Sequence, residues 1–135
     1  MSTERAEQLR ATLRLEPHPE GGHFRETYRS PDRVQPADGR APRSAITTIF
    51  FLLQAGEQSR WHRVTSDEVW HYYEGEGLEL LVAPPTMDRV ARLVLGPVSS
   101  TQRPVYTVPA HWWQAARPLG SHALVGCTVG PGFDF

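Results

Sequence analysis

The sequence predicts an all-β fold of the sandwich or barrel type, preceded by one short helix. Short runs rich in Val, Ile, Thr and aromatic residues recur along most of the chain. Between these runs stand many of its 11 glycines and 12 prolines, at points where the chain must reverse. Nothing after the first segment has helical periodicity. Strands at such spacing favour a closed or double-sheet antiparallel fold.

The helix is expected within residues 1–14, because Ala6, Leu9 and Leu13 recur at helical spacing. Residues 15–135 are expected to form a single domain, since a chain of this length fills one core and would leave two cores marginal. The strands expected in this domain run over His23–Arg29, Ser44–Gln54, Ser59–Val64, Glu68–Glu74, Leu78–Ala83, Arg89–Leu95, Val105–Val108, Trp112–Arg117 and His122–Val129.

One long connection interrupts this series. The segment Ser30–Arg43, "SPDRVQPADGRAPR", has three prolines and no apolar rhythm. Connections of this length are usually surface loops, and many have a function. We expect a surface loop that serves either as a flap over a pocket or as part of a subunit contact.

Composition excludes several classes of partner. The 14 basic and 15 acidic side chains nearly cancel, so no strong field would attract nucleic acid or a membrane surface. The start, "MSTERAEQLR", is too charged for a signal peptide, and no apolar run is long enough to span a bilayer. A cytoplasmic location is expected. The single cysteine, Cys127, is expected to be a small buried strand residue in "LVGCTVG".

Two motifs carry a family resemblance. In the first, five residues separate Gly56 from His62, one separates His62 from Val64, three follow before Glu68, and six before Gly75. This spacing resembles the first motif of the cupin superfamily, with Val64 in place of the usual second histidine.

The second cupin motif is recognisable only by its proline. Pro109 matches that proline, whereas His111, Gln114 and Pro118 stand at its glycine, histidine and asparagine positions. The change that matters for chemistry is at Gln114, because that position normally supplies a metal ligand.

The chain more specifically resembles the Cupin-5 group, through "EPHPEGGHFRETYRS", "WHRVTSDEVWHYYEG", "VPAHWWQAA" and "ALVGCTVGPGFDF". The resemblance implies a double-stranded β-helix, or jelly roll, with one small-molecule pocket in the barrel and usually a homodimer. The group is similar in fold to keto-sugar 3,5-epimerases, which use the barrel interior without a metal. Members usually continue a few residues past "PGFDF", so this chain is either truncated or naturally short.

A metal site is not expected. Cupin metal sites normally combine three histidines and a glutamate, since several ligands are needed to hold a divalent ion and leave positions open for substrate. Val64 cannot ligate and Gln114 is a weak neutral ligand, so His62 and Glu68 alone remain. A divalent metal at this reduced set is the less favoured alternative. His71 is expected to point away from Glu68, because side chains alternate along a strand.

Acid/base chemistry needs fewer assumptions. Burial of Glu68 in the barrel should raise its pKa, and a protonated His62 nearby would oppose that shift. Such a pair can divide the acid and base roles of a proton transfer next to a carbonyl. Tyr28 is a further candidate, either as a phenolic acid or as a wall of the pocket.

Other residues are expected to bind the ligand. Glu26 and Tyr28 alternate onto one face of "HFRETYR", and Thr48 lies in an otherwise apolar strand. Gln114 offers both a donor and an acceptor for orienting a carbonyl or hydroxyl. Trp70 and Tyr72 should share the face of Glu68, as does Glu74, and form the walls.

We therefore expect a small-molecule-binding cupin, with metal-independent isomerase, epimerase or lyase chemistry on a polar or carbohydrate-like substrate as the first hypothesis. A non-catalytic module that binds or senses a small molecule is the second. A metal-dependent cupin oxygenase or hydrolase is the third.

Overall fold

A computed structural model gives the fold, and it describes residues 2–134. One helix, α1 (Ser2–Leu13), precedes all the strands. The strands are β1 (Glu16–Pro17), β2 (His23–Arg29), β3 (Arg33–Val34), β4 (Arg43–Ser44), β5 (Thr47–Gln54), β6 (Ser59–Arg63), β7 (Asp67–Gly75), β8 (Leu78–Ala83), β9 (Ala91–Leu95), β10 (Val105–Val108), β11 (Trp113–Pro118) and β12 (His122–Gly130).

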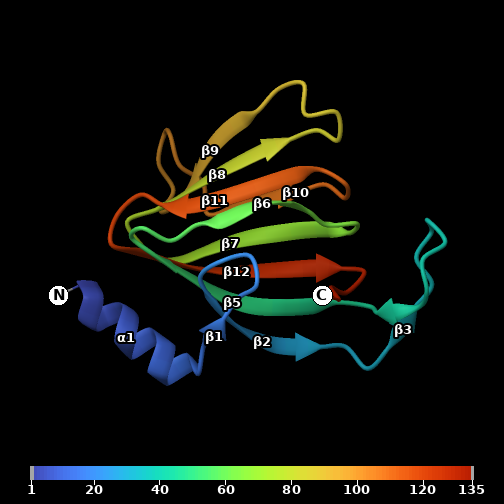
Figure 1. Cartoon of the computed structure of the whole chain (residues 1–135), viewed down its shortest axis with the longest axis horizontal. Coiled ribbons are helices and arrows are strands. Elements are labelled where there is room, and N and C mark those ends of the chain that lie inside the picture. Colours follow the sequence, from blue (N-terminus) through green and yellow to red (C-terminus); the bar gives the residue numbers. More distant parts are fainter. Residues whose placement is uncertain (1, 135) are drawn as a thin grey trace.

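Ten of the strands form two facing sheets, and β3 pairs with β4 in a separate two-stranded sheet (Figure 1). The large sheet has the order β1-β2-β5-β12-β7-β10, and the small sheet the order β6-β11-β8-β9. All the pairings within them are antiparallel. The predicted jelly-roll cupin fold with a short N-terminal helix is confirmed.

The main core lies between the inner faces of the two sheets. Large apolar side chains of β5, β7 and β12 meet those of β8 and β11 there, and the buried set includes Phe51, Leu53, Trp70, Val125, Leu78, Leu80, Val82 and Ala116. The alternation of side chains along each strand sends these residues inward. The polar site described below occupies one end of the same interior.

The helix covers part of the outer face of the large sheet. Ala6 and Leu9 of α1 pack against Leu52 and Leu124 in a second buried cluster. Because α1 covers this face, β5 is apolar on both sides. Within residues 2–134, no helix combines the length and hydropathy that crossing a membrane requires.

All nine expected strands are present, and three short ones were missed. The run expected as Ser44–Gln54 breaks between β4 and β5, because the chain at residues 45 and 46 bonds instead to the loop before β3. The amide of Ala45 donates to the Asp32 carbonyl at 2.8 Å, and the amide of Ser30 donates to the Ile46 carbonyl at 3.0 Å. The segment Ser30–Arg43 is therefore a loop that carries β3 (Figure 1) and, at its end, the first residue of β4.

A bulge in β7 changes which side chains face inward. In β7 the register with β12 shifts between Tyr72, opposite Val125, and Glu74, opposite Leu124. Tyr73 is the extra residue, so Glu74 turns to the outer face instead of sharing the face of Glu68 as expected. There Glu74 binds Arg5 of α1 at 2.6 Å and His122 at 2.9 Å.

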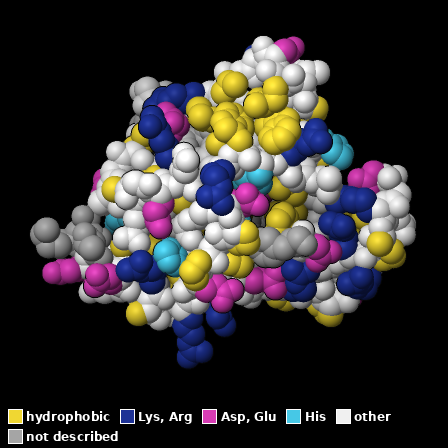
Figure 2. All heavy atoms as spheres, in the orientation of Figure 1, with side chains coloured by type: hydrophobic (Ala, Val, Ile, Leu, Met, Phe, Trp, Pro, Cys, Tyr) yellow, Lys and Arg dark blue, Asp and Glu magenta, His cyan; other side chains and the backbone are white. Residues whose placement is uncertain are grey.

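The surface in the orientation of Figure 2 carries acidic and basic side chains side by side. Hydrophobic side chains gather at the top of this view, over the region where Figure 1 places β8, β9 and β11. This distribution agrees with the formal net charge of −1.

Candidate functional site

A small cavity lies between the sheets at the end of the barrel where β2, β5, β6, β7 and β12 come together. Its volume is about 40 Å³, which is room for only a few water molecules. Its lining combines apolar walls with several titratable groups: His18, Glu20, Phe24, Glu26, Thr47, Ile49, His62, Glu68, Cys127, Val129 and Phe133. Three of the expected site residues, Glu26, His62 and Glu68, are among them.

Glu68 on β7 is the buried acid of this cavity, with 8% of its surface exposed. The side-chain amide of Gln114 donates to it at 2.7 Å, and Cys127 lines the cavity beside it. Burial raises the pKa of Glu68, while Gln114, His62 and Cys127 oppose the rise by favouring the carboxylate. Burial also raises the pKa of the Cys127 thiol, which therefore stays protonated.

Gln114 and Trp70 support Glu68 from behind and do not line the cavity. Trp70 donates from its indole nitrogen to the side-chain oxygen of Gln114 at 2.8 Å, and both residues are 1% exposed. Both ends of the Gln114 amide are thus used within the protein. The expectation that Gln114 orients the ligand and Trp70 forms a wall is corrected: both position Glu68.

His62 faces Glu68 from the other sheet. It lies on β6, opposite Gln114 of β11. Its Nδ1 lies 2.7 Å from the carbonyl oxygen of Arg60. A carbonyl only accepts, so Nδ1 carries a proton, and in the corresponding neutral tautomer Nε2 is the acceptor nitrogen. An imidazole and a carboxyl group therefore lie on opposite walls of one cavity.

His18 is a cavity residue that the sequence did not single out. Its Nδ1 accepts the amide N–H of Glu20 at 2.9 Å, which assigns the proton of the neutral ring to Nε2. Its ring packs edge-on against Phe24, with centroids 4.7 Å apart. Burial, with a smaller contribution from the nearby charge of His62, lowers the pKa of His18 to about 4. The neutral His18 is thus a hydrogen-bond donor, complementary to His62.

At the mouth of the cavity, an arginine binds the C-terminal segment to β2. Arg29 on β2 pairs with Glu26 at 2.7 Å and with Asp134 at 3.2 Å. It also donates to the carbonyl of Phe133 at 2.9 Å, and the amide of Phe133 donates to Thr47 at 2.9 Å. These bonds fix the C-terminal segment across the opening, so Phe133 forms part of the cavity wall.

Three expected site residues lie elsewhere. The register of β2 with β5 shifts between Glu26 and Tyr28, so Tyr28 pairs with Thr48 on the outer face of the large sheet and is 52% exposed. Thr48 hydrogen-bonds Thr128 on that face at 3.1 Å, whereas its neighbour Thr47 faces the cavity. Tyr72 is inward but donates to the Gly75 carbonyl at 2.6 Å and packs in the main core. Tyr28, Thr48 and Tyr72 do not line the cavity.

The donor set does not fit the metal that cupins commonly bind. The oxygen of Gln114 accepts from Trp70, and its NH2 group faces Glu68, so this side chain turns no ligand atom toward the cavity. Val64 at the other ligand position is apolar. Within residues 2–134, no group of three or more His, Cys, Asp or Glu side chains is arranged to hold a metal ion. His71 faces outward as expected and stacks on Tyr73, with centroids 6.5 Å apart.

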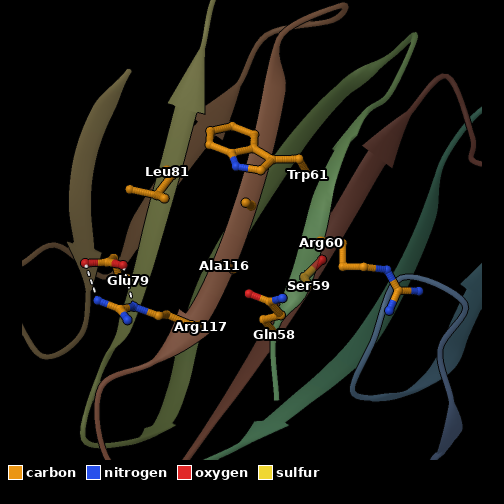
Figure 3. A pocket seen from close by; sticks show the side chains of 9 residues that line it. Gln58, Ser59, Arg60, Trp61, Glu79, Leu81, Ala116 and Arg117 are labelled. Atoms are coloured by element: carbon orange, nitrogen blue, oxygen red, sulfur yellow. Dashed lines mark hydrogen bonds and ion pairs between the residues drawn. The ribbon is translucent and has the colours of Figure 1, made fainter. Parts of the chain in front are cut away.

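A larger groove, of about 590 Å³, lies on the outer face of the small sheet (Figure 3). Trp61 and Leu81 line its apolar part. Its acid, Glu79, is already bound by two arginines, Arg92 and Arg117, the latter at 2.6 Å. These bonds hold the pKa of Glu79 below its ordinary value. The described residues that line the groove therefore include no unpaired carboxyl or imidazole group of the kind that the inner cavity holds.

Three residues of the cavity and its mouth were not predicted as site residues, although the sequence contains a weak indication of each. His18 and Arg29 belong to "EPHPEGGHFRETYRS", and Cys127 to "ALVGCTVGPGFDF", two of the stretches that carry the family resemblance. Strict alternation from Glu26 would have put Arg29 on the outer face, because a bulge cannot be recognised from these residues.

Comparisons with known proteins agree with this architecture. The chain matches the sequence profile of the Cupin-5 family, described as cupin superfamily (DUF985), over residues 7–135. A search among curated proteins found no match.

Several solved structures are similar. A hypothetical protein from Leishmania major is 34% identical, with a TM-score of 0.89 over 96% of this chain and 82% of its own. A protein from Shewanella oneidensis is also 34% identical, with a TM-score of 0.86 over 96% and 80% of the two chains. KdgF from a Halomonas species shares the fold, at 15% identity and a TM-score of 0.59 over 89% and 87%. From its sequence and its structure, the chain is a member of the Cupin-5 family of the cupin superfamily.

Proposed function

We propose that this cupin binds a polar or carbohydrate-like small molecule in its inner cavity and catalyses a metal-independent proton transfer, as an isomerase, epimerase or lyase. His62 is the base and Glu68 the acid. His18 and Glu26 contact the ligand, whereas Gln114 and Trp70 position Glu68. The observation that carries the proposal is the arrangement of a lone pair on His62 and a buried carboxyl on Glu68 around one cavity.

The geometry suits proton transfer at a carbon next to a carbonyl. In this scheme Nε2 of His62 removes the proton, and the electron pair of the broken C–H bond moves onto the carbonyl oxygen. Glu68, whose pKa is raised by burial, then delivers a proton from the side of the opposite sheet. Delivery to the same carbon gives epimerisation, and delivery to a leaving group gives elimination.

Deuterium exchange tests the proposal without a known substrate. A panel of small keto-sugars and sugar acids is incubated with the protein in D2O, and loss of the C–H signal next to the carbonyl is followed by proton NMR. Exchange should occur with some members of the panel and should be lost in H62Q and E68Q. E16Q, at an exposed position of β1, is the matched control and should be fully active. Exchange that survives both substitutions would remove the pair from the mechanism.

A second candidate is a binding module without catalysis, and the observation that favours it is the closed mouth. Phe133 and its bonds to Thr47 and Arg29 reduce the cavity far below the roughly 300 Å³ of a typical ligand pocket. A binding module would retain its ligand unchanged. Mass spectrometry of the contents of the protein after incubation with the same panel separates the two candidates.

We also propose that the chain forms a homodimer through the outer face of the large sheet that α1 leaves uncovered. Tyr28 and Tyr73 are each 52% exposed and Val105 is 45% exposed. Tyr73 and Val105 lie on the neighbouring strands β7 and β10, and Tyr28 lies on β2, beyond β12 and β5 of the same sheet. Phe50 lies beside Tyr73, with ring centroids 6.0 Å apart. Aromatic residues of this kind are enriched at protein interfaces.

Light scattering tests the assembly. The wild-type protein should have the mass of a dimer at micromolar concentration, and Y73R should shift it to the monomer because a charge would be buried in the contact. M87R introduces the same charge at an exposed site outside the large sheet and should leave the dimer intact. A monomeric wild-type protein, or a dimer unaffected by Y73R, would contradict this assignment.

A further inference from the structure

A second hollow adjoins the inner cavity. It has a volume of about 370 Å³ and lies beside the C-terminal segment, where Arg43, Arg63, Thr65 and Ser66 line it. We call these four residues the arginine groove. Glu20 and Phe133 line both hollows, so these two side chains form the wall between the inner cavity and the arginine groove.

The guanidinium groups of Arg43 and Arg63 have N–H donors that are available for further hydrogen bonds. Nε of Arg43 is buried and has no hydrogen-bond partner in the described part of the chain, although one terminal nitrogen donates to the Gly132 carbonyl at 3.3 Å. Arg63 lies over the ring of Trp113, 5.1 Å from its centroid, which leaves the edge of its guanidinium for other partners. In residues 2–134 neither arginine forms a salt bridge with a carboxylate.

A third arginine, in the loop Ser30–Arg43, contacts two residues of the arginine groove. Arg40 donates to the hydroxyl of Thr65 at 2.6 Å and to that of Ser66 at 3.1 Å. Both hydroxyls are thus held in place and remain able to donate their own protons. Arginine guanidinium groups together with hydroxyl donors are a typical setting for carboxylate or phosphate oxygens.

The acids facing the groove are Glu20 and Asp134. Asp134 is not bound to the groove arginines but to Arg29, at 3.2 Å, and it is exposed. The C-terminal segment therefore brings an aromatic ring to the inner cavity and a carboxylate to the rim. A small molecule with an apolar or polar body and an anionic group could make the same two contacts. Its body would lie at the inner cavity and its anionic group at the rim.

We infer that the arginine groove is the anion-binding half of one ligand site, with Phe133 as the partition that moves aside to join it to the inner cavity. The ligand class is a small molecule that carries a carboxylate or phosphate. Its anionic group binds Arg43 and Arg63, and its reacting part lies between His62 and Glu68. This inference rests on the proposed function for the reacting half only, because anion binding in the groove needs no proton transfer.

Anion binding is tested with inorganic phosphate and with acetate, followed by the NMR shifts of the amides of Thr65 and Ser66. Saturable binding is expected, and R43Q and R63Q should each weaken it about tenfold, the loss typical of one charge-assisted hydrogen bond. R89Q removes an exposed arginine between β8 and β9 and should leave the affinity unchanged. Tighter binding of phosphate than of acetate assigns a phosphate ligand, and the reverse order a carboxylate.

Two further variants, in the C-terminal segment, test whether this segment controls anion binding in the arginine groove. D134N removes a competing negative charge and should strengthen anion binding. F133A should bind phenyl phosphate more tightly than inorganic phosphate, because the ring of the probe replaces the missing side chain, whereas the wild-type protein should not distinguish the two. E68Q should leave phosphate affinity unchanged, so a failure of the proposed catalysis is distinguishable from a failure of this inference.

Three outcomes would overturn the inference. The first is phosphate and acetate binding that R43Q and R63Q leave intact. The second is an equal loss in R89Q, which would mean an adventitious ion only. The third is an F133A variant that gains no preference for phenyl phosphate, which would show that the two hollows are separate.

Discussion

The indole nitrogen of Trp70 lies 2.8 Å from the side-chain oxygen of Gln114. This bond decides which way the Gln114 amide points, because an indole N–H can only donate and so must meet the oxygen end. The NH2 end is then directed to Glu68, 2.7 Å away. A residue at a former metal-ligand position has thereby become the support of a carboxyl group.

Replacing Trp70 by Phe should therefore destabilise the protein. The substitution keeps most of the apolar volume but leaves the oxygen of Gln114 buried without a donor, at a cost of about 1–3 kcal/mol. Urea unfolding followed by circular dichroism measures the difference. W61F, at a half-exposed position in the outer groove, is the control and should change stability by less than about 0.5 kcal/mol.

Replacing Gln114 by Leu should raise the pKa of Glu68 further. The Gln114 hydrogen bond favours the carboxylate against the larger effect of burial, so its loss shifts the balance toward the protonated acid. Carbon-13 NMR of the Glu68 carboxyl across a pH titration measures the change. Q58L, an exposed position, should leave the titration as in the wild-type protein. A lower pKa in Q114L would mean that Gln114 does not stabilise the carboxylate.

The strands of this fold could be predicted because turn residues and apolar alternation mark both ends of each long strand. The strands β1, β3 and β4 have two residues each, too short for any periodicity to show. The break between β4 and β5 depends on bonds to Asp32 and Ser30, which are contacts made only in the folded chain.

The site was harder to predict than the fold, because it depends on the direction of single side chains. His62, Glu68 and Glu26, which motif spacing and alternation pointed to, line the cavity. Tyr28 was misplaced by the bulge at Thr27, which reverses the alternation without a signature in "HFRETYR". Thr48 was misplaced because β5 is apolar on both faces, so alternation could not tell it from Thr47.

The low pKa of His18, about 4, predicts that stability falls in mildly acidic solution. The unfolded chain takes up a proton near pH 6.5, whereas the folded protein does so only near pH 4. Stability linked to His18 is therefore complete above pH 6.5 and is lost as the pH falls toward 4. H18N retains an acceptor for the Glu20 amide and should flatten this part of the pH dependence. H111N, at an exposed turn, should not.

Glu74 predicts a pH dependence at lower pH. Its hydrogen bonds to Arg5 of α1 and to His122 lower its pKa to about 2, against the opposing effect of burial. The stabilisation is present above the ordinary pKa of 4.5 and is lost as the pH falls toward 2.

Hydrogen exchange of the α1 amides measures the docking of the helix. E74Q should increase exchange in α1 at pH 7 and remove its acid dependence, while E76Q, which changes an acid bound to Ser121 instead, should not affect the helix. Equal protection of α1 in E74Q and in the wild-type protein would exclude this contact as the attachment of the helix.

Gly75 should be the least replaceable glycine of the turn between β7 and β8. Its φ is +115°, and a Cβ there would lie 2.2 Å from the carbonyl oxygen of His122, which is main chain and has no freedom to swing away. G75A should cost about 1–3 kcal/mol from the backbone conformation alone, and more because β12 must shift. Gly39 has a φ of +85° but no atom within 4 Å of the same position, so G39A should cost only about 1 kcal/mol. Urea unfolding of the two variants compares them directly. Equal costs would mean that β7 and β12 can separate at this point, which would also loosen the strand that carries Glu68.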